Sequence, residues 1–103
     1  MKEELFTYLR TQIGEDQDTL DMLFSEYKAT LEQKLGQISP MLEQGSLEEL
    51  RPIAHSLKGD TAIVGDTTAN RAAVAFEAAV KSGLLAESRQ LFAELQACLK
   101  QLE

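Results

Sequence analysis

The chain has 103 residues, which is enough for one compact domain spanning residues 1–103 and too few for two. Its net charge of −7, with basic residues scattered along the sequence, disfavours nucleic acid as a partner. No apolar run reaches about 18 residues, which argues against a membrane span, and the charged start, Met1 to Arg10, is not typical of a signal peptide. Cys98 is the only cysteine, so an intramolecular disulfide is excluded and a reducing, cytoplasmic location is expected.

Helices are predicted almost throughout, since Leu, Ala, Glu and Gln are abundant and there are only two prolines. A short first helix is predicted over about residues 2–12, and Gly14 ends it. A long second helix is predicted to begin near Asp16, to be interrupted or kinked at Pro40, and to close at Gly45. Apolar residues recur every three or four positions in both helices: Leu5, Phe6, Leu9, Leu20, Leu23, Phe24, Tyr27, Leu31, Leu35 and Ile38.

A third helix is predicted to follow directly. Ser46 and Glu49 have the Ser-x-x-Glu spacing of a capping box, in which each side chain bonds to the backbone of the other residue. The helix is predicted to run to about Val64 and to stop at Gly65, which suits a left-handed end. Pro52 lies inside it and removes one backbone hydrogen bond.

Two further helices complete the predicted fold. A cap at Asp66 or Thr67 begins the fourth, Ser82 and Gly83 end it, and the fifth covers about residues 86–102. Short connections between amphipathic helices predict an all-α fold: an antiparallel up-down four-helix bundle with a short additional N-terminal helix. Because four helices can bury their own apolar faces, a monomer is expected.

His55 is the only histidine, and helical geometry predicts where it points. On a helical wheel with Leu50 at zero, the predicted core positions of the third helix, Ile53, Ala54, Leu57, Thr61 and Val64, fall within about 60° of Leu50. His55 falls at about 140°, on the solvent side. Lys58 and Arg51, one turn away on either side, place positive charge where it can stabilise a phosphoryl group.

The surroundings of His55 favour contact with another protein. Gly59 lies one turn after His55 and Ala62 one turn further, so the imidazole is left uncovered. Much of an exposed imidazole is neutral at neutral pH and can act as a nucleophile. A metal site is not expected because there is no second histidine, and no Gly-x-Ser-x-Gly run indicates a serine hydrolase.

Residues 54–59 read Ala-His-Ser-Leu-Lys-Gly, and Gly65 follows ten residues after His55. This run resembles the signature of the histidine-containing phosphotransfer (HPt) family, Ala-His-x-Leu-Lys-Gly-x5-Gly, at all six specified positions. The run 13–16 and the pair Phe76-Glu77 also look like family features, so the resemblance extends over nearly the whole chain. The chain departs from the family pattern at Asp60 and Asp66, where small residues are common.

The resemblance implies a role for each matching residue. His55 would be the phosphoacceptor, through Nε2, and Lys58 would contact the phosphoryl oxygens. Gly59 would give the incoming partner room, Gly65 would end the helix, and Glu77 would help to orient the phosphohistidine. The expected partner-binding surface around His55 consists of Arg51, Ser56, Gly59, Ala62 and Ile63.

The function implied is that of a phosphoryl carrier. It would accept a phosphoryl group on His55 from one receiver-domain aspartate and pass it to another in a multistep two-component phosphorelay. The expected partners are response-regulator receiver domains and a hybrid sensor histidine kinase. No glycine-rich phosphate loop or Gly-Lys-Ser/Thr run is present, so the protein is expected to lack its own ATP site and not to be an enzyme. No cofactor or metal of its own is expected, and Mg²⁺ would be bound by the partner receiver domain.

Two alternatives stay open. The N-terminal phosphoacceptor domain of a chemotaxis-type histidine kinase shares the His-Ser-(Ile/Leu)-Lys-Gly core; the end of the chain at Glu103, without a kinase module, disfavours it. A receiver-docking module without phosphotransfer is disfavoured by the intact His55 and Lys58.

Overall fold

Four helices make up the computed structural model, which describes Thr11 and residues 16–102. They are α2 (Gln17–Gln44), α3 (Leu47–Ile63), α4 (Thr67–Lys81) and α5 (Leu85–Leu102). Within this part of the chain there are only helices and no strands, which confirms the all-α class. The additional helix predicted over about residues 2–12 lies outside the described residues, apart from Thr11.

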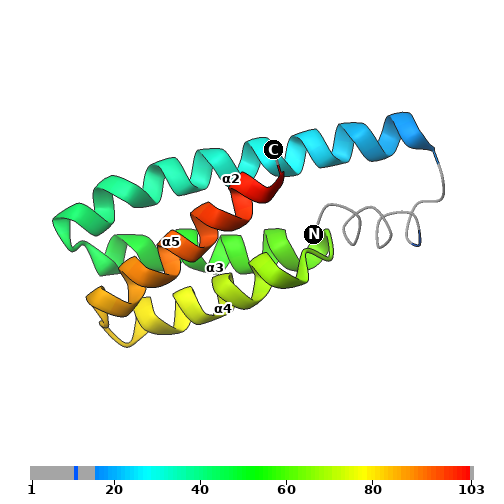
Figure 1. The fold of residues 1–103 in the computed structure, drawn as a ribbon. Helices are drawn as coiled ribbons and strands as arrows, with labels where there is room; N and C mark the ends of the chain where they lie inside the picture. Colours follow the sequence, from blue (N-terminus) through cyan, green and yellow to red (C-terminus); the bar gives the residue numbers. More distant parts are fainter. Residues whose placement is uncertain (1–10, 12–15, 103) are drawn as a thin grey trace.

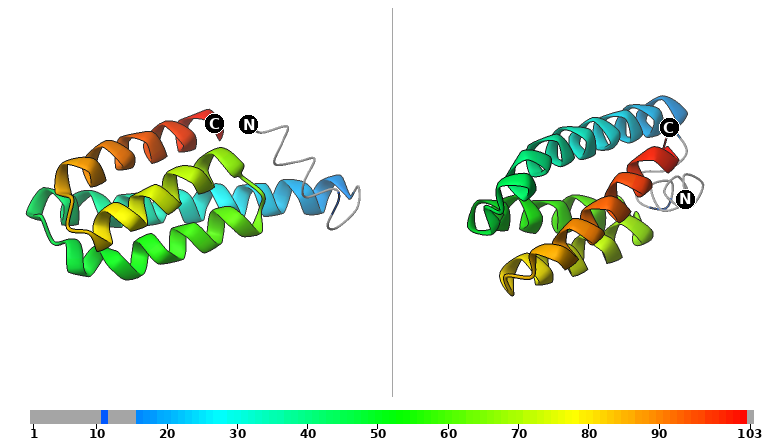
Figure 2. Two further views of the ribbon diagram at one scale, coloured as in Figure 1. Left: turned by 90° about the horizontal axis from the view of Figure 1, so that it is seen from below. Right: turned by 60° about the vertical axis from the view of Figure 1, so that its left-hand side comes forward.

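The four helices pack side by side around one core. In Figure 1 the chain reverses direction at each of the three connections between α2 and α5, and the two views of Figure 2 show the same arrangement from other sides. The main contacts join α2 to α3, α3 to α4, α4 to α5, and α5 back to α2. α3 therefore lies between α2 and α4, and both of these helices can place side chains beside its exposed face.

Apolar side chains from all four helices fill this core. Each fully buried leucine contributes about 1.5–3 kcal/mol, whereas an exposed pair such as Lys28–Glu32, at 3.9 Å on α2, contributes about 0.3–0.5 kcal/mol. The core therefore determines the stability of the fold. The largest apolar side chains that are fully buried in it are Leu20, Leu31, Ile38, Leu50, Leu57, Phe76, Leu95 and Leu102.

The predicted helix ends are mostly confirmed. The Asp16 side chain accepts a hydrogen bond from the backbone N–H of Thr19 at the start of α2. Asp66 does the same for Ala69 at the start of α4, at 3.2 Å. Gly45, at φ 72°, ends α2 in the left-handed region, which glycine adopts without steric cost.

Two details of the predicted helix ends need comment. α2 continues through Pro40 to Gln44, so of the two effects predicted for this proline the interruption is excluded. Ser46 precedes α3 but makes no side-chain capping bond. Its backbone N–H, which Glu49 would need for a capping box, donates instead to the carbonyl of Met41 at 2.9 Å. The backbone N–H of Ser46 is thus used to end α2 and is not free for a capping box at the start of α3.

Candidate functional site

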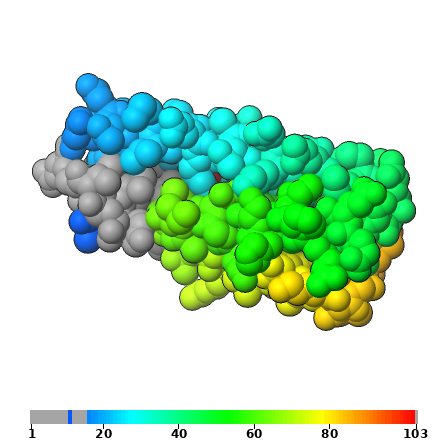
Figure 3. All heavy atoms as spheres, turned by 180° about the vertical axis from the view of Figure 1, so that it is seen from behind, coloured from blue at the N-terminus to red at the C-terminus, as the bar shows by residue number. Residues whose placement is uncertain are grey.

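His55 lies on the exposed face of α3, as the wheel predicts. Its side chain is 70% exposed, whereas Leu50, Ala54 and Leu57 on the opposite side of the helix are fully buried. In Figure 3, α3 (green) crosses the middle of the visible face, with α2 on one side and α4 on the other. A large partner can therefore approach this helix directly.

A buried carboxylate from α4 holds one nitrogen of the His55 ring. The Glu77 side chain is only 6% exposed, and its Oε2 atom lies 2.7 Å from His55 Nδ1. Its Oε1 atom lies 2.8 Å from the Nζ atom of Lys58. The Nζ atom of Lys81 lies 3.7 Å from Oε2. One carboxylate is thus shared by the imidazole and two ammonium groups, which satisfies its charge despite its burial.

These contacts keep Glu77 ionised. The hydrogen bond from Lys58 has the largest effect, and together with the bond to His55 and the nearby lysine charges it lowers the pKa of Glu77 from 4.5 to about 2, against the opposing effect of burial. An ionised carboxylate can only accept hydrogen bonds, so His55 Nδ1 must carry the proton. In the neutral ring, Nε2 therefore holds the free lone pair.

Asn70 connects α4 to α3 beside this cluster. Its Nδ2 atom donates to the backbone carbonyl of Lys58 and to the Thr61 hydroxyl, both at 3.1 Å. The Thr61 hydroxyl itself donates to the carbonyl of Leu57 at 2.9 Å. The turn of α3 that carries Lys58 is thereby fixed to α4. Sequence reasoning did not identify Asn70.

On its other flank, α3 is joined to α2 by Lys34. The ammonium group of Lys34 donates to the hydroxyl of Ser56 and forms an ion pair with Asp60. Ser56, predicted to face the partner, is half-buried and turned toward α2. Asp60, one of the departures from the family pattern, lies on the flank of α3 that faces α2. Sequence reasoning did not identify Lys34.

Apart from Ser56, the predicted docking residues are exposed. A Cβ atom added at Gly59 would meet nothing within 4 Å, so packing within the chain does not require glycine there. Ala62 is exposed, and Ile63 is 75% exposed. Arg51 is also exposed, but its guanidinium group lies 3.4 Å from Glu48, one turn before it on the same helix. The structure thus pairs Arg51 with a carboxylate of its own helix.

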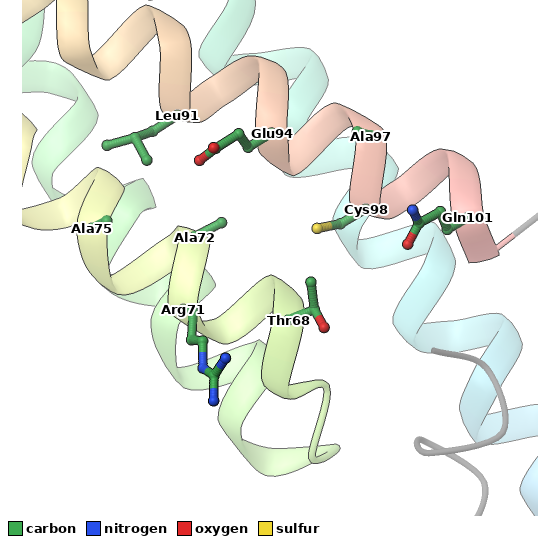
Figure 4. A pocket seen from close by; sticks show the side chains of 9 residues that line it. All are labelled: Thr68, Arg71, Ala72, Ala75, Leu91, Glu94, Ala97, Cys98 and Gln101. Atoms are coloured by element: carbon green, nitrogen blue, oxygen red, sulfur yellow. The ribbon is translucent and has the colours of Figure 1, made fainter.

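The hollow shown in Figure 4 lies elsewhere. Its volume is about 410 Å³. It is open to solvent between α4 and α5, and its lining does not include His55, Lys58 or Glu77. The exposed face around His55 is therefore separate from this hollow. The hollow is lined by Thr68, Arg71, Ala72, Ala75, Leu91, Glu94, Ala97, Cys98 and Gln101.

Comparison with known protein families identifies the family of this chain. The family described as "Hpt domain" matches residues 22–103, which include α3, α4, α5 and most of α2. The chain belongs to the Hpt domain family. Hpt domains are histidine phosphotransfer modules of two-component signalling, and they interact with receiver domains and kinases in phosphorelays. No curated protein and no solved structure matched this chain significantly.

Among residues 16–102, no helix combines the length and apolar character that a membrane crossing needs. The same part of the chain contains no cluster of three or more His, Cys, Asp or Glu side chains suited to a metal ion.

Proposed function

We propose that this Hpt domain accepts a phosphoryl group on His55 Nε2 from the aspartyl phosphate of one receiver domain and passes it to the aspartate of another. The observation that carries the proposal is the contact of 2.7 Å between His55 Nδ1 and the ionised Glu77, on a ring that is 70% exposed. This contact places the proton on Nδ1 and leaves Nε2 free to attack.

The lone pair of Nε2 attacks the phosphorus of the aspartyl phosphate, an N–P bond forms, and the P–O bond to the aspartate breaks. The aspartate leaves as a carboxylate. The His55 ring gains positive charge and keeps its proton on Nδ1, which donates a hydrogen bond to Glu77 at 2.7 Å. The reverse steps deliver the phosphoryl group to the second receiver.

Charge near the phosphoryl group comes from both proteins in this proposal. Lys58, whose side chain is 37% exposed, can leave Glu77 and bind phosphoryl oxygens. Mg²⁺ would be supplied by the receiver domain, and the Hpt domain would need no cofactor and no ATP site. Gly59, Ala62 and Ile63, with Arg51 and Ser56 at the edges, would form the docking surface.

The proposal also covers the bundle topology, the oligomeric state and the cellular location of the Hpt domain. The Hpt domain would act as a single-domain, monomeric, antiparallel up-down bundle in the cytoplasm. The reversal of the chain at each connection in Figure 1 supports the bundle topology. The single, buried Cys98 supports a reducing compartment.

The test is phosphotransfer from phosphorylated receiver domains, comparing the wild-type protein with His55→Gln by intact-mass spectrometry. We expect one acid-labile phosphoryl group on the wild type and none on the variant. If receivers fail to label the protein but phosphoramidate labels His55, the nucleophile is functional and the receivers chosen are wrong. If neither donor labels His55, the carrier function is refuted and docking without phosphotransfer replaces it.

A further inference from the structure

A small hollow lies between α2 and α3, next to the proposed docking surface. Its volume is about 190 Å³. Pockets for small molecules usually have about 300–1,000 Å³, so this hollow suits a single side chain better than a separate ligand. Leu23 on α2, with Ile63 and Val64 at the end of α3, gives it apolar walls. Figure 3 shows α2 and α3 side by side on the visible face.

Two carboxylates also line this hollow. They belong to Glu26 on α2 and Asp60 on α3. Asp60 forms an ion pair with Lys34. Glu26 is exposed and forms no ion pair with any other residue that the structure describes. The hollow therefore combines apolar walls with one carboxylate whose charge is not balanced.

A lysine or arginine side chain matches this combination. Such side chains lay their apolar stem along apolar surface while the charged head reaches an anion or water. In this hollow the stem would contact Leu23 and Ile63, and the head would reach Glu26. An acidic side chain would be repelled, and a purely apolar one would remove water from Glu26 without offering it a partner.

The hollow is close enough to His55 to be covered by the same partner. Ile63 belongs to the proposed docking surface and follows His55 by eight positions, which is about 12 Å along the helix. A standard interface covers about 800 Å² on each protein, equivalent to a disc of about 16 Å radius. A receiver domain centred on His55 would therefore reach the hollow.

We propose that this hollow binds a lysine or arginine side chain of the receiver domain and thereby selects receivers that carry a cation at that point. This inference rests on the proposed phosphotransfer at His55. Lys58 is paired with a residue of α4, and Asp60 with a residue of α2. The docking surface would thus have a cation on one flank and carboxylates on the other, which orients the receiver. Since Asp60 departs from the family pattern, the selection would be a property of this chain.

Both carboxylates also have ordinary explanations. An exposed glutamate on a helix is commonly just solvated. Asp60 joins α3 to α2 through Lys34, which holds the two helices together. Neither explanation makes transfer from a receiver depend on the sign of the charge at position 26. Reversal of that charge therefore separates them from the proposal.

The measurement is kcat/KM for phosphotransfer to His55 from a receiver domain that labels the wild type. We expect Glu26→Lys to lower it about tenfold, because two cations would then meet in the hollow, and Glu26→Gln to lower it less. Glu32→Lys is the matched control, since Glu32 is an exposed residue of the same helix that lines a different hollow, between α2 and α5. It should transfer at nearly the wild-type rate. Labelling by phosphoramidate should be equal in all variants, which shows that the fold and His55 are intact.

Charge reversal on the receiver identifies the partner of Glu26. Each exposed lysine and arginine of the receiver is replaced in turn by glutamate. One of these variants should transfer faster to Glu26→Lys than to the wild type.

The other outcomes overturn the inference. If Glu26→Lys is labelled by the receiver as fast as the wild type, or faster, no cation binds in the hollow and the proposed function stands. If Glu26→Lys and Glu32→Lys slow transfer equally, the cause is net charge and the inference is refuted. If neither receivers nor phosphoramidate label His55 in the wild type, the proposed function fails and this inference fails with it.

Discussion

His55 and Glu77 lie eleven residues to either side of Asp66, and their side chains meet at 2.7 Å across the α3–α4 connection. Equal distances along two helices from a tight turn place residues opposite each other when the helices run back alongside one another. The carboxylate thus reaches the Nδ1 side of the ring because of the register of the two helices. Replacement of Glu77 therefore tests how the carboxylate affects the protonation of the His55 ring, while the nucleophilic Nε2 atom stays in place.

Glu77→Ala should change which ring nitrogen of His55 carries the proton. With its acceptor removed, Nδ1 loses the partner that selects the Nδ1–H form. We expect ¹⁵N NMR of the imidazole to show a mixture of the two neutral forms, and phosphorylation by phosphoramidate to slow about tenfold, equivalent to about 1.4 kcal/mol. Glu77→Gln, which keeps one acceptor oxygen, should retain most of the Nδ1–H form. An unchanged ¹⁵N spectrum in Glu77→Ala would show that Glu77 does not select this form.

Gly59 offers a test of the docking surface with a matched control within the chain. Gly36 in α2 is also a helical glycine at which an added Cβ would meet nothing within 4 Å. Gly36→Gln and Gly59→Gln should therefore each stabilise the fold by about 0.5–1 kcal/mol, measured by urea unfolding. Only Gly59→Gln should slow phosphotransfer from a receiver, by tenfold or more, because its side chain occupies the space beside His55. Equal transfer rates in both variants would place the docking surface elsewhere.

The sequence predicted directions within a helix better than contacts between helices. The wheel placed His55 outside and Leu57 inside because each position depends only on α3. Lys34 was missed because its contact with Ser56 depends on how α2 and α3 are aligned. A usable signal exists, however. Lys34 and Ser56 lie eleven residues to either side of Gly45, the same spacing that brings Glu77 to His55.

The contact between Tyr27 and Asp66 could not be predicted from equal spacing on either side of a turn. Tyr27 and Asp66 are joined across 39 positions of the sequence and not across a single turn. Periodicity shows that Tyr27 faces the core, but it does not show which polar group meets the phenol there. The family pattern marked Asp66 only as unusual. The structure explains it, because its two carboxylate oxygens bind Tyr27 and cap α4.

Tyr27→Phe should therefore destabilise the fold without affecting the site. The Tyr27 hydroxyl donates to Asp66 Oδ2 at 2.8 Å, and Asp66 is only 1% exposed. Burial, with the nearby Asp66 carboxylate, raises the pKa of Tyr27 well above its usual value, so the hydroxyl keeps its proton. Its loss leaves a buried acceptor without this partner and should cost about 1–3 kcal/mol in urea unfolding. Labelling of His55 by phosphoramidate should be unchanged. An unaltered unfolding midpoint would mean that water replaces the hydroxyl.

Glu77 should also make the stability of the fold depend on pH. Its pKa is about 2 in the folded protein and 4.5 as its usual value, so the folded state favours the ionised form. The stabilisation is fully present above about pH 4.5 and is lost as the pH falls toward 2, because the carboxylate must then be protonated. Glu77→Gln cannot titrate, so its free energy of unfolding should fall less over this range in urea titrations.

Lys58→Met tests whether the low pKa of Glu77 causes this pH dependence of stability. The hydrogen bond from Lys58 is the largest contribution to the low pKa of Glu77, so its removal should weaken the pH dependence without abolishing it. The hydrogen bond from His55 and the charge of Lys81 would still favour the ionised carboxylate. The order of pH dependence should therefore be wild type, then Lys58→Met, then Glu77→Gln. A Glu77→Gln variant that loses stability below pH 4.5 as steeply as the wild type would show that other carboxylates cause the acid sensitivity.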